Sequence, residues 1–466
     1  MIYIVVGLYT IAGIFTIIFF DGTGGSGDSI YHYLHARYAP VHPEHFFDHW
    51  AKPLYVFLAC PFAQFGFTGI KVFNLINALI TIYFSYKIAA AFHLKNAILV
   101  SVFMFFSPLF YILTFSGLTE PLFATVLTIG IYLLLKQKHT SASILLSFLP
   151  FVRSEGMIIL GVVAFFLIID RKWRYIPYLI AGHVIYSVAG YFHYHDLLWV
   201  FNRNPYSTLN SLYGNGELLH YVDQLIYVVG VPLYILFWIG VLSSLTDLIR
   251  KRSTASFQTL IVLGFFSFLI AHSLFWYLGI FNSMGLKRVF VGVVPLMSIF
   301  ALKGFNFITE ELIGKFRVIK ISLQYILVIY VIIFPFTSNP AALDFKTDMS
   351  LSTDQKCAID VAEHIKTKYT SLPRLVYNHP YLSEVFNIDH FDHDVRASIF
   401  KDFKSNTKKD DVLIWDNWFC VIEDNIPNES LESSDILKKE YKCNKADELR
   451  EVEFNVYNRQ RKDPEI

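Results

Sequence analysis

Long apolar runs separated by short polar or basic connections dominate the sequence up to about residue 337. A helix needs roughly 20 residues to cross the hydrocarbon core of a bilayer, and runs of about that length recur throughout this region. The pattern predicts eleven membrane-spanning helices, at residues 2–20, 72–92, 97–115, 118–135, 141–152, 155–170, 175–193, 225–248, 257–280, 288–303 and 319–336.

The basic connections predict the orientation of these helices. With eleven crossings, all the Lys- and Arg-rich connections fall on one side, which the positive-inside trend assigns to the cytoplasm. The N-terminus is then inside, and everything after about residue 337 is outside. The runs 141–152 and 155–170 are short, so the number of crossings could differ from eleven. An even number would put the tail in the cytoplasm. The basic connections are Lys136/Lys138, Arg171–Lys172–Arg174, Arg250–Lys251–Arg252 and Lys303–Lys315–Arg317–Lys320.

Two outer loops and a polar tail complete the predicted organisation. The first loop, 21–71, is aromatic and polar and is typical of helices lying at the membrane interface. The second covers about 194–224. The tail, 338–466, mixes helix-like and strand-like segments, which indicates a soluble α/β domain. The fold class is therefore mainly α, a polytopic membrane domain over 1–337 followed by this C-terminal domain. The helix-like segments are 353–369 and 433–441, and the strand-like ones are 374–377, 412–415 and 452–456.

Composition supports a membrane protein. The chain is 54% hydrophobic and only 17% charged, where a soluble protein would carry about a quarter charged residues. The net charge of +1 gives no reason to expect a nucleic-acid partner. The four cysteines show no zinc or redox spacing. An extracytoplasmic tail would allow a disulfide between Cys420 and Cys443.

Charged residues gather at the outer face of this predicted topology. Charges in or near the apolar slab are costly, so each is a candidate site residue. Their alternating signs suggest a phosphate held by Arg and Lys with carboxylates close by. A carboxylate can act as general base while the cations stabilise a departing phosphate, which is the chemistry needed to move a sugar from a lipid phosphate. The residues are Asp21, Asp28, Asp48, His49, Lys52, Glu120, Arg153, Glu155, Lys287 and Arg288.

Each candidate also has a structural interpretation. Asp21 would cap a helix and Asp28 would serve a turn, while Lys52 would reach the lipid headgroups. Glu120 would complement a helix dipole. Arg153 and Glu155 would form an ion pair that allows the chain to make a hairpin turn within the membrane. Lys287 and Arg288 would be interfacial anchors, although they run against the positive-inside trend, which favours phosphate binding.

Histidines are numerous in the first loop, so a divalent metal is a further candidate ligand. With Asp28 or Asp48 they offer suitable metal-binding groups. Their spacing matches no closed zinc motif, and the metal requirement stays unknown. The histidines are His32, His35, His42, His45 and His49.

Several short segments in the first third of the chain together resemble motifs of one family, the GT-C glycosyltransferases. Its aminoarabinose transferases and protein O-mannosyltransferases are the nearest branch. The resemblance covers about residues 1–160 with useful motifs. The segments are Gly27-Asp28-Ser29, Asp48 to Tyr55 with Lys52-Pro53, Phe65-Gly66, Val72-Phe73-Asn74, Ser116 to Pro121 around Glu120, and Arg153-Ser154-Glu155-Gly156.

The resemblance implies an inverting transfer from a polyprenyl-phosphate sugar donor to a lipid, glycan or protein acceptor. It implies that Asp28 is the catalytic acid of the first loop, that Glu120 lies in the second acidic motif, and that Lys52, helped by Arg153 or Arg288, binds the donor phosphate. Many relatives carry a second acidic residue beside the first, whereas Asp28 lies between Gly27 and Ser29. Because some relatives use a metal in this site, the departure puts metal dependence in doubt.

Three other functions fit parts of the pattern. A lipid-linked-sugar flippase or another transporter would also bury charges, but would place them through both leaflets. An oligosaccharide polymerase or ligase would carry its main loop late among the spans. A non-catalytic scaffold would not need the inner Arg153 and Glu155. We expect a bacterial inner membrane with a periplasmic tail, with the ER membrane as the alternative, and a tail that recognises the acceptor or a glycan.

Overall fold

The computed structural model describes residues 1–25, 27–206, 211, 213–313, 316–399, 401–447 and 450–460. The chain forms two compact units. The helical unit contains residues 1–24 and 35–349. The C-terminal unit contains residues 25–34 together with everything from Ser350 onward. Helix α2 (Gly27–Tyr38) therefore begins in the C-terminal unit.

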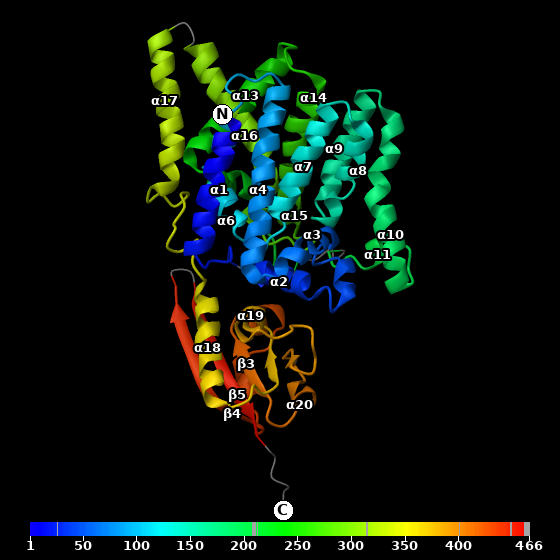
Figure 1. The fold of residues 1–466 in the computed structure, drawn as a ribbon, viewed down its shortest axis with the longest axis vertical. Helices are drawn as coiled ribbons and strands as arrows, with labels where there is room; N and C mark the ends of the chain where they lie inside the picture. Colours follow the sequence, from blue (N-terminus) through cyan, green and yellow to red (C-terminus); the bar gives the residue numbers. More distant parts are fainter. Residues whose placement is uncertain are drawn as a thin grey trace, which may run out of the picture. The chain divides into compact units, whose positions relative to one another are not determined.

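The helical unit is a bundle of apolar helices (Figure 1). Shorter 3₁₀ segments include η1 (Pro43–Phe47), η2 (Leu149–Phe151) and η5 (Lys287–Val293). The α-helices are α1 (Ile2–Phe19), α3 (Pro53–Ala63), α4 (Gly66–Ala91), α5 (Leu99–Phe105), α6 (Pro108–Thr114), α7 (Glu120–Leu135), α8 (His139–Leu146), α9 (Gly156–Ile169), α10 (Ala181–Tyr194), α11 (Trp199–Asn202), α12 (His220–Val229), α13 (Val231–Ile249), α14 (Ala255–Phe257), α15 (Gly264–Leu278), α16 (Val294–Asn306) and α17 (Arg317–Ile333).

Six stretches of the described chain are long and apolar enough to cross a membrane. They match the predicted spans that begin at residues 2, 72, 225, 257, 288 and 319. The predicted count of eleven is not confirmed, because other apolar runs form shorter or broken helices. The run 97–115, for example, divides into α5 and α6 where Pro108 begins a new helix; proline cannot donate the backbone hydrogen bond that would continue the first helix.

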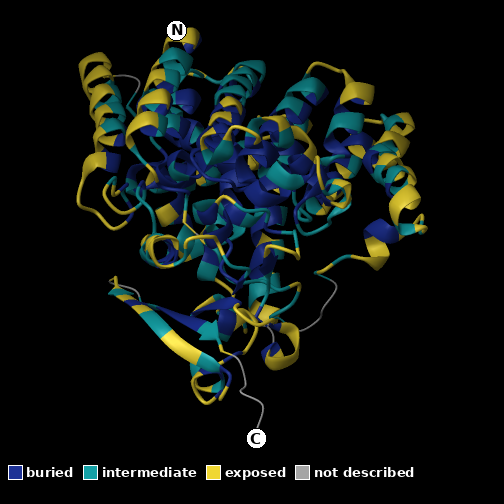
Figure 2. Ribbon diagram, turned by 60° about the horizontal axis from the view of Figure 1, so that its bottom comes forward, coloured by how far each residue is buried: buried dark blue, intermediate teal, exposed yellow. Residues whose placement is uncertain are grey.

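Many residues on the outer surface of this unit are exposed (Figure 2), and large apolar side chains are numerous among them. In α1, Ile11 and Ile18 are each about two-thirds exposed, and Ile326 of α17 is 60% exposed. Exposed apolar patches of this extent are stable against lipid and are rare on soluble proteins. The chain is therefore a multi-pass integral membrane protein.

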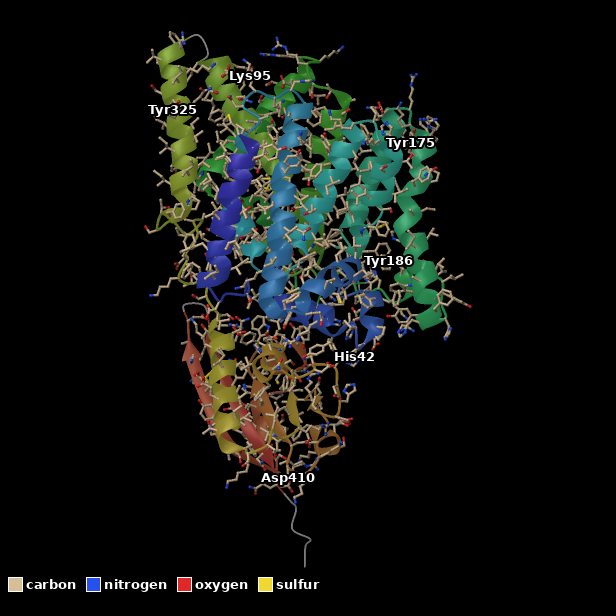
Figure 3. The ribbon with its side chains drawn as sticks, in the orientation of Figure 1. His42, Lys95, Tyr175, Tyr186, Tyr325 and Asp410 are labelled. Carbon is tan, nitrogen blue, oxygen red and sulfur yellow. A yellow bond between two sulfur atoms is a disulfide. The ribbon has the colours of Figure 1, made fainter. Side chains whose placement is uncertain are left out.

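The two ends of the bundle separate the basic connections from the first loop. Lys95 and Tyr175 lie at one end of the bundle and His42 at the other (Figure 3). Lys95 follows α4 and pairs with Glu310 at 2.9 Å, and Tyr175 follows the basic segment that ends at Arg174. The first loop thus lies opposite these basic residues, as the predicted path requires.

The C-terminal unit contains a five-stranded sheet of order β2-β1-β3-β5-β4. β1 (Leu375–Tyr377) pairs in parallel with β2 (Arg396–Ala397) and β3 (Val412–Asp416), whereas β5 (Glu451–Arg459) runs antiparallel to β3 and to β4 (Leu437–Ala446). Helix α18 (Thr353–Lys368) covers one face through a core that includes Val361 and Ile414. Shorter helices are α19 (Tyr381–Phe386), α20 (Phe403–Asn406) and α21 (Asn428–Glu432), with the π-helical η8 (Phe419–Glu423) after β3.

One predicted element of this unit is wrong. The segment 433–441 is not helical, because residues from Leu437 onward form β4. Its lysines and glutamate are good helix formers by intrinsic propensity. In the sheet they lie on an edge strand, where charged side chains are common because they discourage pairing with other chains. The helix at 353–369 and the three predicted strands are confirmed.

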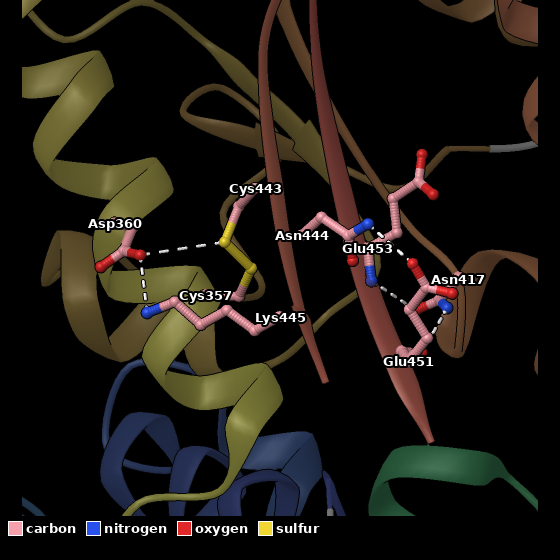
Figure 4. The surroundings of a disulfide bond; sticks show 8 residues. All are labelled: Cys357, Asp360, Asn417, Cys443, Asn444, Lys445, Glu451 and Glu453. Atoms are coloured by element: carbon pink, nitrogen blue, oxygen red, sulfur yellow. Dashed lines mark hydrogen bonds and ion pairs between the residues drawn. A yellow bond between two sulfur atoms is a disulfide. The ribbon is translucent and has the colours of Figure 1, made fainter. Parts of the chain in front are cut away.

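The disulfide between Cys420 and Cys443 that the sequence would allow does not form. Cys443 is bonded instead to Cys357, which joins β4 to α18 (Figure 4), and Cys420 is a buried free thiol. The sequence spacing alone could not choose between these partners, because strand β4 faces α18 only once the sheet has formed.

Breaking this disulfide should destabilise the C-terminal unit strongly. The bond closes a loop of 86 residues, and the chain-entropy model gives about 4–5 kcal/mol for a loop of that size. We expect a Cys357→Ser, Cys443→Ser double variant to exchange amide hydrogens of β3 and β5 much faster than wild type in the full-length protein. Reduction of the wild type should reproduce this effect, whereas Cys420→Ser serves as a control without it. Equal protection in all variants would contradict the expectation.

The first turn of α18 carries an ion pair that should make this unit sensitive to acid. Asp354 accepts from Nη2 of Arg450 and from Nε2 of His379, each at 3.0 Å. Burial raises the pKa of Asp354, but the hydrogen bond from His379 and the charge of Arg450 outweigh it and hold this pKa well below its usual range.

The folded state therefore keeps Asp354 ionised at pH values where the unfolded chain binds a proton, so its contribution to stability is present above about pH 4 and is lost as pH falls further. We expect wild type to exceed Asp354→Asn in the stability of the C-terminal unit at pH 7 and to lose this advantage in strong acid. Amide hydrogen exchange in α18, measured for both proteins at several pH values, would show this difference in stability. A difference that does not change with pH would refute the role assigned to this charge.

Candidate functional site

The turn between η2 and α9 carries Arg153, whose guanidinium lies between two carboxylates. Its Nη1 is 2.7 Å from Oε1 of Glu120, and its Nη2 is 2.9 Å from Oε1 of Glu155. Gly156 lets the turn close, because a Cβ there would collide with the backbone of Leu149. The arginine thus joins the start of α7 to the start of α9.

Glu120, the first residue of α7, is completely buried. The dipole of α7 favours a carboxylate at this end, and Nε of Arg288 lies 3.8 Å from its Oε1. Its other oxygen, Oε2, and Nε of Arg153 are buried and have no hydrogen-bond partner among the described residues. Buried polar atoms in proteins nearly always have partners. These two atoms therefore indicate a place where polar groups of a ligand fit.

Lys52 approaches the same turn from the first loop. Its Nζ donates to Oγ of Ser154 and to the carbonyl of His49, both at 3.2 Å, and lies 4.3 Å from the ring centre of Tyr206. The backbone of Lys52 has φ +68°, a left-handed conformation that side chains rarely adopt. Such strain often occurs at functional sites, where the surrounding structure enforces it. The strained backbone therefore makes Lys52 a candidate functional residue.

Sequence reasoning missed His272, which lies within α15. Its Nε2 is 3.8 Å from Oε1 of Glu155, and the residue is buried. The available signal was an ionisable residue in the middle of an apolar run, which is unusual in a spanning helix. Ser154 and Tyr206 were also not predicted, because serine and tyrosine are common in such loops.

We call Lys52, Glu120, Arg153, Glu155 and Arg288 the outer-face cluster, after the face to which the predicted topology assigns them. It contains three cationic side chains and two carboxylates, so one net positive charge remains. Burial together with the neighbouring Lys52 lowers the pKa of His49 to about 4, so this histidine is neutral at neutral pH and adds no charge. The cluster is therefore suited to a buried or half-buried anion, and Arg side chains can bind phosphate through two parallel hydrogen bonds.

Three other predicted residues lie outside these contacts. Nζ of Lys287 lies 5.1 Å from the ring centre of Tyr227. Asp48 accepts a hydrogen bond from the backbone of Ala51 at 2.8 Å, which is the role of a turn residue. Asp21 interacts electrostatically with Lys71. The proposed site roles of Asp48 and Asp21 stay predictions.

Asp28 belongs to the C-terminal unit, in the first turn of α2. A carboxylate is favoured there by the helix dipole. Its role as the base stays a prediction.

Two of the first-loop histidines, His35 and His45, form a pair. Nδ1 of His35 and Nδ1 of His45 are 3.2 Å apart. Among the residues that the structure describes, no three His, Cys, Asp or Glu side chains are grouped so that they could hold a metal ion.

Comparison with known proteins gives matches among solved structures. No protein-family model matches the chain, and neither does any curated protein. The crystal structure of ArnT from Cupriavidus metallidurans bound to undecaprenyl phosphate is similar with a TM-score of 0.62 and 11% sequence identity, covering 97% of both chains. The same protein in the apo state gives a TM-score of 0.60, with the same identity and coverage. The chain therefore shares this fold over nearly its whole length.

Proposed function

We propose that this chain, whose fold is that of the GT-C glycosyltransferases, transfers a sugar from a polyprenyl-phosphate donor to an acceptor on the extracytoplasmic face of the membrane. The observation that carries the proposal is the outer-face cluster, a group of buried and half-buried charges with one net positive charge. Two of its buried atoms, Oε2 of Glu120 and Nε of Arg153, have no hydrogen-bond partner among the described residues. The similar ArnT structure that is bound to undecaprenyl phosphate supports a lipid phosphate as the ligand.

The proposed orientation rests on separate observations. The Cys357–Cys443 disulfide supports an extracytoplasmic C-terminal unit, because disulfides persist in oxidising compartments. The predicted topology puts the same unit and the first loop outside. We infer a bacterial inner membrane with this unit in the periplasm.

The proposed reaction is a single displacement with inversion at the anomeric carbon. The acceptor hydroxyl oxygen attacks that carbon while the bond from the carbon to the phosphate oxygen breaks. The hydroxyl proton passes to the carboxylate of Asp28, and the polyprenyl phosphate leaves with the electron pair. Lys52, Arg153 and Arg288 stabilise the charge that develops on the leaving phosphate. Glu120 and Glu155 hold Arg153 in place, and Oε2 of Glu120 accepts from a sugar hydroxyl.

A transfer assay tests the proposal. Purified protein in lipid would be offered a panel of labelled polyprenyl-phosphate sugars together with a membrane glycolipid extract, and both transferred label and released polyprenyl phosphate would be measured. We expect transfer from at least one donor, loss of transfer in Glu120→Gln, and normal transfer in Glu217→Gln, an exposed outer-loop control. A wild-type protein that binds donors in lipid but moves them across the bilayer without hydrolysis or transfer would establish the flippase alternative and refute this proposal.

A further inference from the structure

The carboxyl ends of the parallel strands of the C-terminal unit contact α2. Asn378 follows β1, and its carbonyl accepts a hydrogen bond from the hydroxyl of Tyr31 at 3.1 Å. The ring of Tyr31 packs edge-on against His390 at 5.3 Å and Phe419 at 6.3 Å between ring centres. In sheets of this kind, the carboxyl edge of the parallel strands is the usual ligand-binding edge. Here it receives a helix of the first loop.

Two further contacts fix the position of α2 on this edge. The hydroxyl of Tyr33, a fully buried residue, donates to Oε2 of Glu384 in α19 at 2.7 Å. Gly27 lies directly against the ring of Phe419, so that a Cβ at this position would collide with the ring. Because Gly27 precedes Asp28, this tight contact lies beside the proposed base.

The residues that receive α2 are themselves held in place. The side chain of Asn378 donates to Asp424 at 2.6 Å and accepts from the backbone of Ile399 at 2.7 Å. The backbone N–H of Phe419 donates to Oδ1 of Asp416 at 2.6 Å, and Asp416 is almost completely buried at the end of β3. The edge is therefore a preformed surface and not a loose loop.

The contact at Gly27 leaves no room for a side chain. Phe419 occupies the space that a side chain at residue 27 would need. The start of α2 therefore packs against this ring.

We propose that the C-terminal unit is a positioning platform for the catalytic acid, in which Phe419 and Glu384 act through Gly27, Tyr31 and Tyr33 to hold Asp28 in its reactive place. This inference rests on the proposed function of Asp28. None of these residues touches substrate in the proposal; they are positioning residues, and a misplacement of about 1 Å at a catalytic group can cost about 10²-fold in rate.

Compensating substitutions test the platform. Gly27→Val should push α2 off the Phe419 ring and lower kcat about 10²-fold, with the KM for donor unchanged because the phosphate-binding cations lie in the helical unit. Adding Phe419→Ala should make room for the valine and restore kcat to within about tenfold of wild type. A double variant that remains as slow as Gly27→Val, or a Gly27→Val variant with normal kcat, would overturn the platform.

A matched pair of tyrosine variants separates positioning from stability. Tyr33→Phe and Tyr369→Phe each remove a hydroxyl that donates to a glutamate of the C-terminal unit, Glu384 and Glu440 respectively. Only Tyr33→Phe should lower kcat, by about three- to tenfold, a loss expected for one hydrogen bond. Equal effects of the two would indicate a purely structural role and refute the proposal.

A measurement that does not depend on catalysis tests the platform separately from the proposed base. Phe419→Ala should speed amide hydrogen exchange in the peptide that covers α2, and Tyr369→Phe should not. Unchanged exchange in α2 would overturn the platform. Turnover that persists in Asp28→Asn would instead refute the proposed base, so failure of the base and failure of the platform give different results.

Discussion

Arg153→Ala should lower sugar transfer at least about 10²-fold, since removal of one preorganised donor to a developing charge typically costs 10²–10³ in rate. The change removes the net positive charge of the outer-face cluster. It also leaves the carboxylates of Glu120 and Glu155 without the cation that lies 2.7 and 2.9 Å from them. The measurement is the initial rate of transfer in lipid, with the amount of folded protein checked by size-exclusion chromatography.

Part of the expected loss of transfer in Arg153→Ala comes from lower stability, and a second variant separates this part from the loss of catalysis. Breaking a buried ion pair by removing one partner commonly costs 3–5 kcal/mol of stability. Arg153→Ala combined with Glu155→Gln restores the net charge of the cluster and should recover stability but little transfer. Arg203→Ala, which removes an arginine stacked on Tyr194 in the second outer loop, is the control with normal rate. Normal transfer by Arg153→Ala would contradict the role of the cluster.

Asp28→Asn should reduce kcat by about 10²–10⁴-fold, the usual contribution of a general base. The amide keeps the size of the carboxylate and its place at the start of α2 but cannot take the proton of the acceptor hydroxyl. Donor affinity should be unchanged, because the phosphate-binding cations are elsewhere in the chain. Single-turnover rates and donor binding would be measured on the same preparations.

Asp21→Asn is the matched control for this variant. Both aspartates lie in the first loop, but Asp21 interacts with Lys71 and should tolerate the change with a rate within a few-fold of wild type. If Asp21→Asn lost turnover and Asp28→Asn kept it, the assignment of the base would be reversed.

The residues of the outer-face cluster could be predicted because a charged residue in or near an apolar run is by itself a candidate site residue. Lys52, Glu120, Arg153, Glu155 and Arg288 all stand near the ends of apolar runs, and the topology put them at one face. Their pairing was predictable only in part. Sequence order suggested the Arg153–Glu155 pair, but the shorter contact from Arg153 to Glu120 depends on how α7 packs against η2.

Long-range contacts were beyond sequence reasoning. Nothing in the chain near Gly27 reveals that Phe419 will occupy the space beside it, so the assignment of the start of α2 to the C-terminal unit could not be foreseen. The Cys357–Cys443 pairing and the edge strand β4 are similar cases. The sequence also does not distinguish whether Trp415 and Trp418 are core residues or belong to a sugar-contacting loop. In the structure, Trp415 is buried with its indole N–H donating to the carbonyl of Ile426, whereas Trp418 is 36% exposed beside Arg450.

The most direct test of the central claim is the binding of undecaprenyl phosphate to the purified protein, measured by native mass spectrometry against undecaprenol, the same chain without phosphate. We predict that wild type prefers the phosphate strongly and that Lys52→Ala weakens its binding about tenfold or more, as expected for loss of a charge-assisted hydrogen bond. The Arg203→Ala control should keep the preference. Equal binding of the two lipids by wild type, or full preference in Lys52→Ala, would contradict a lipid-phosphate site at the outer-face cluster.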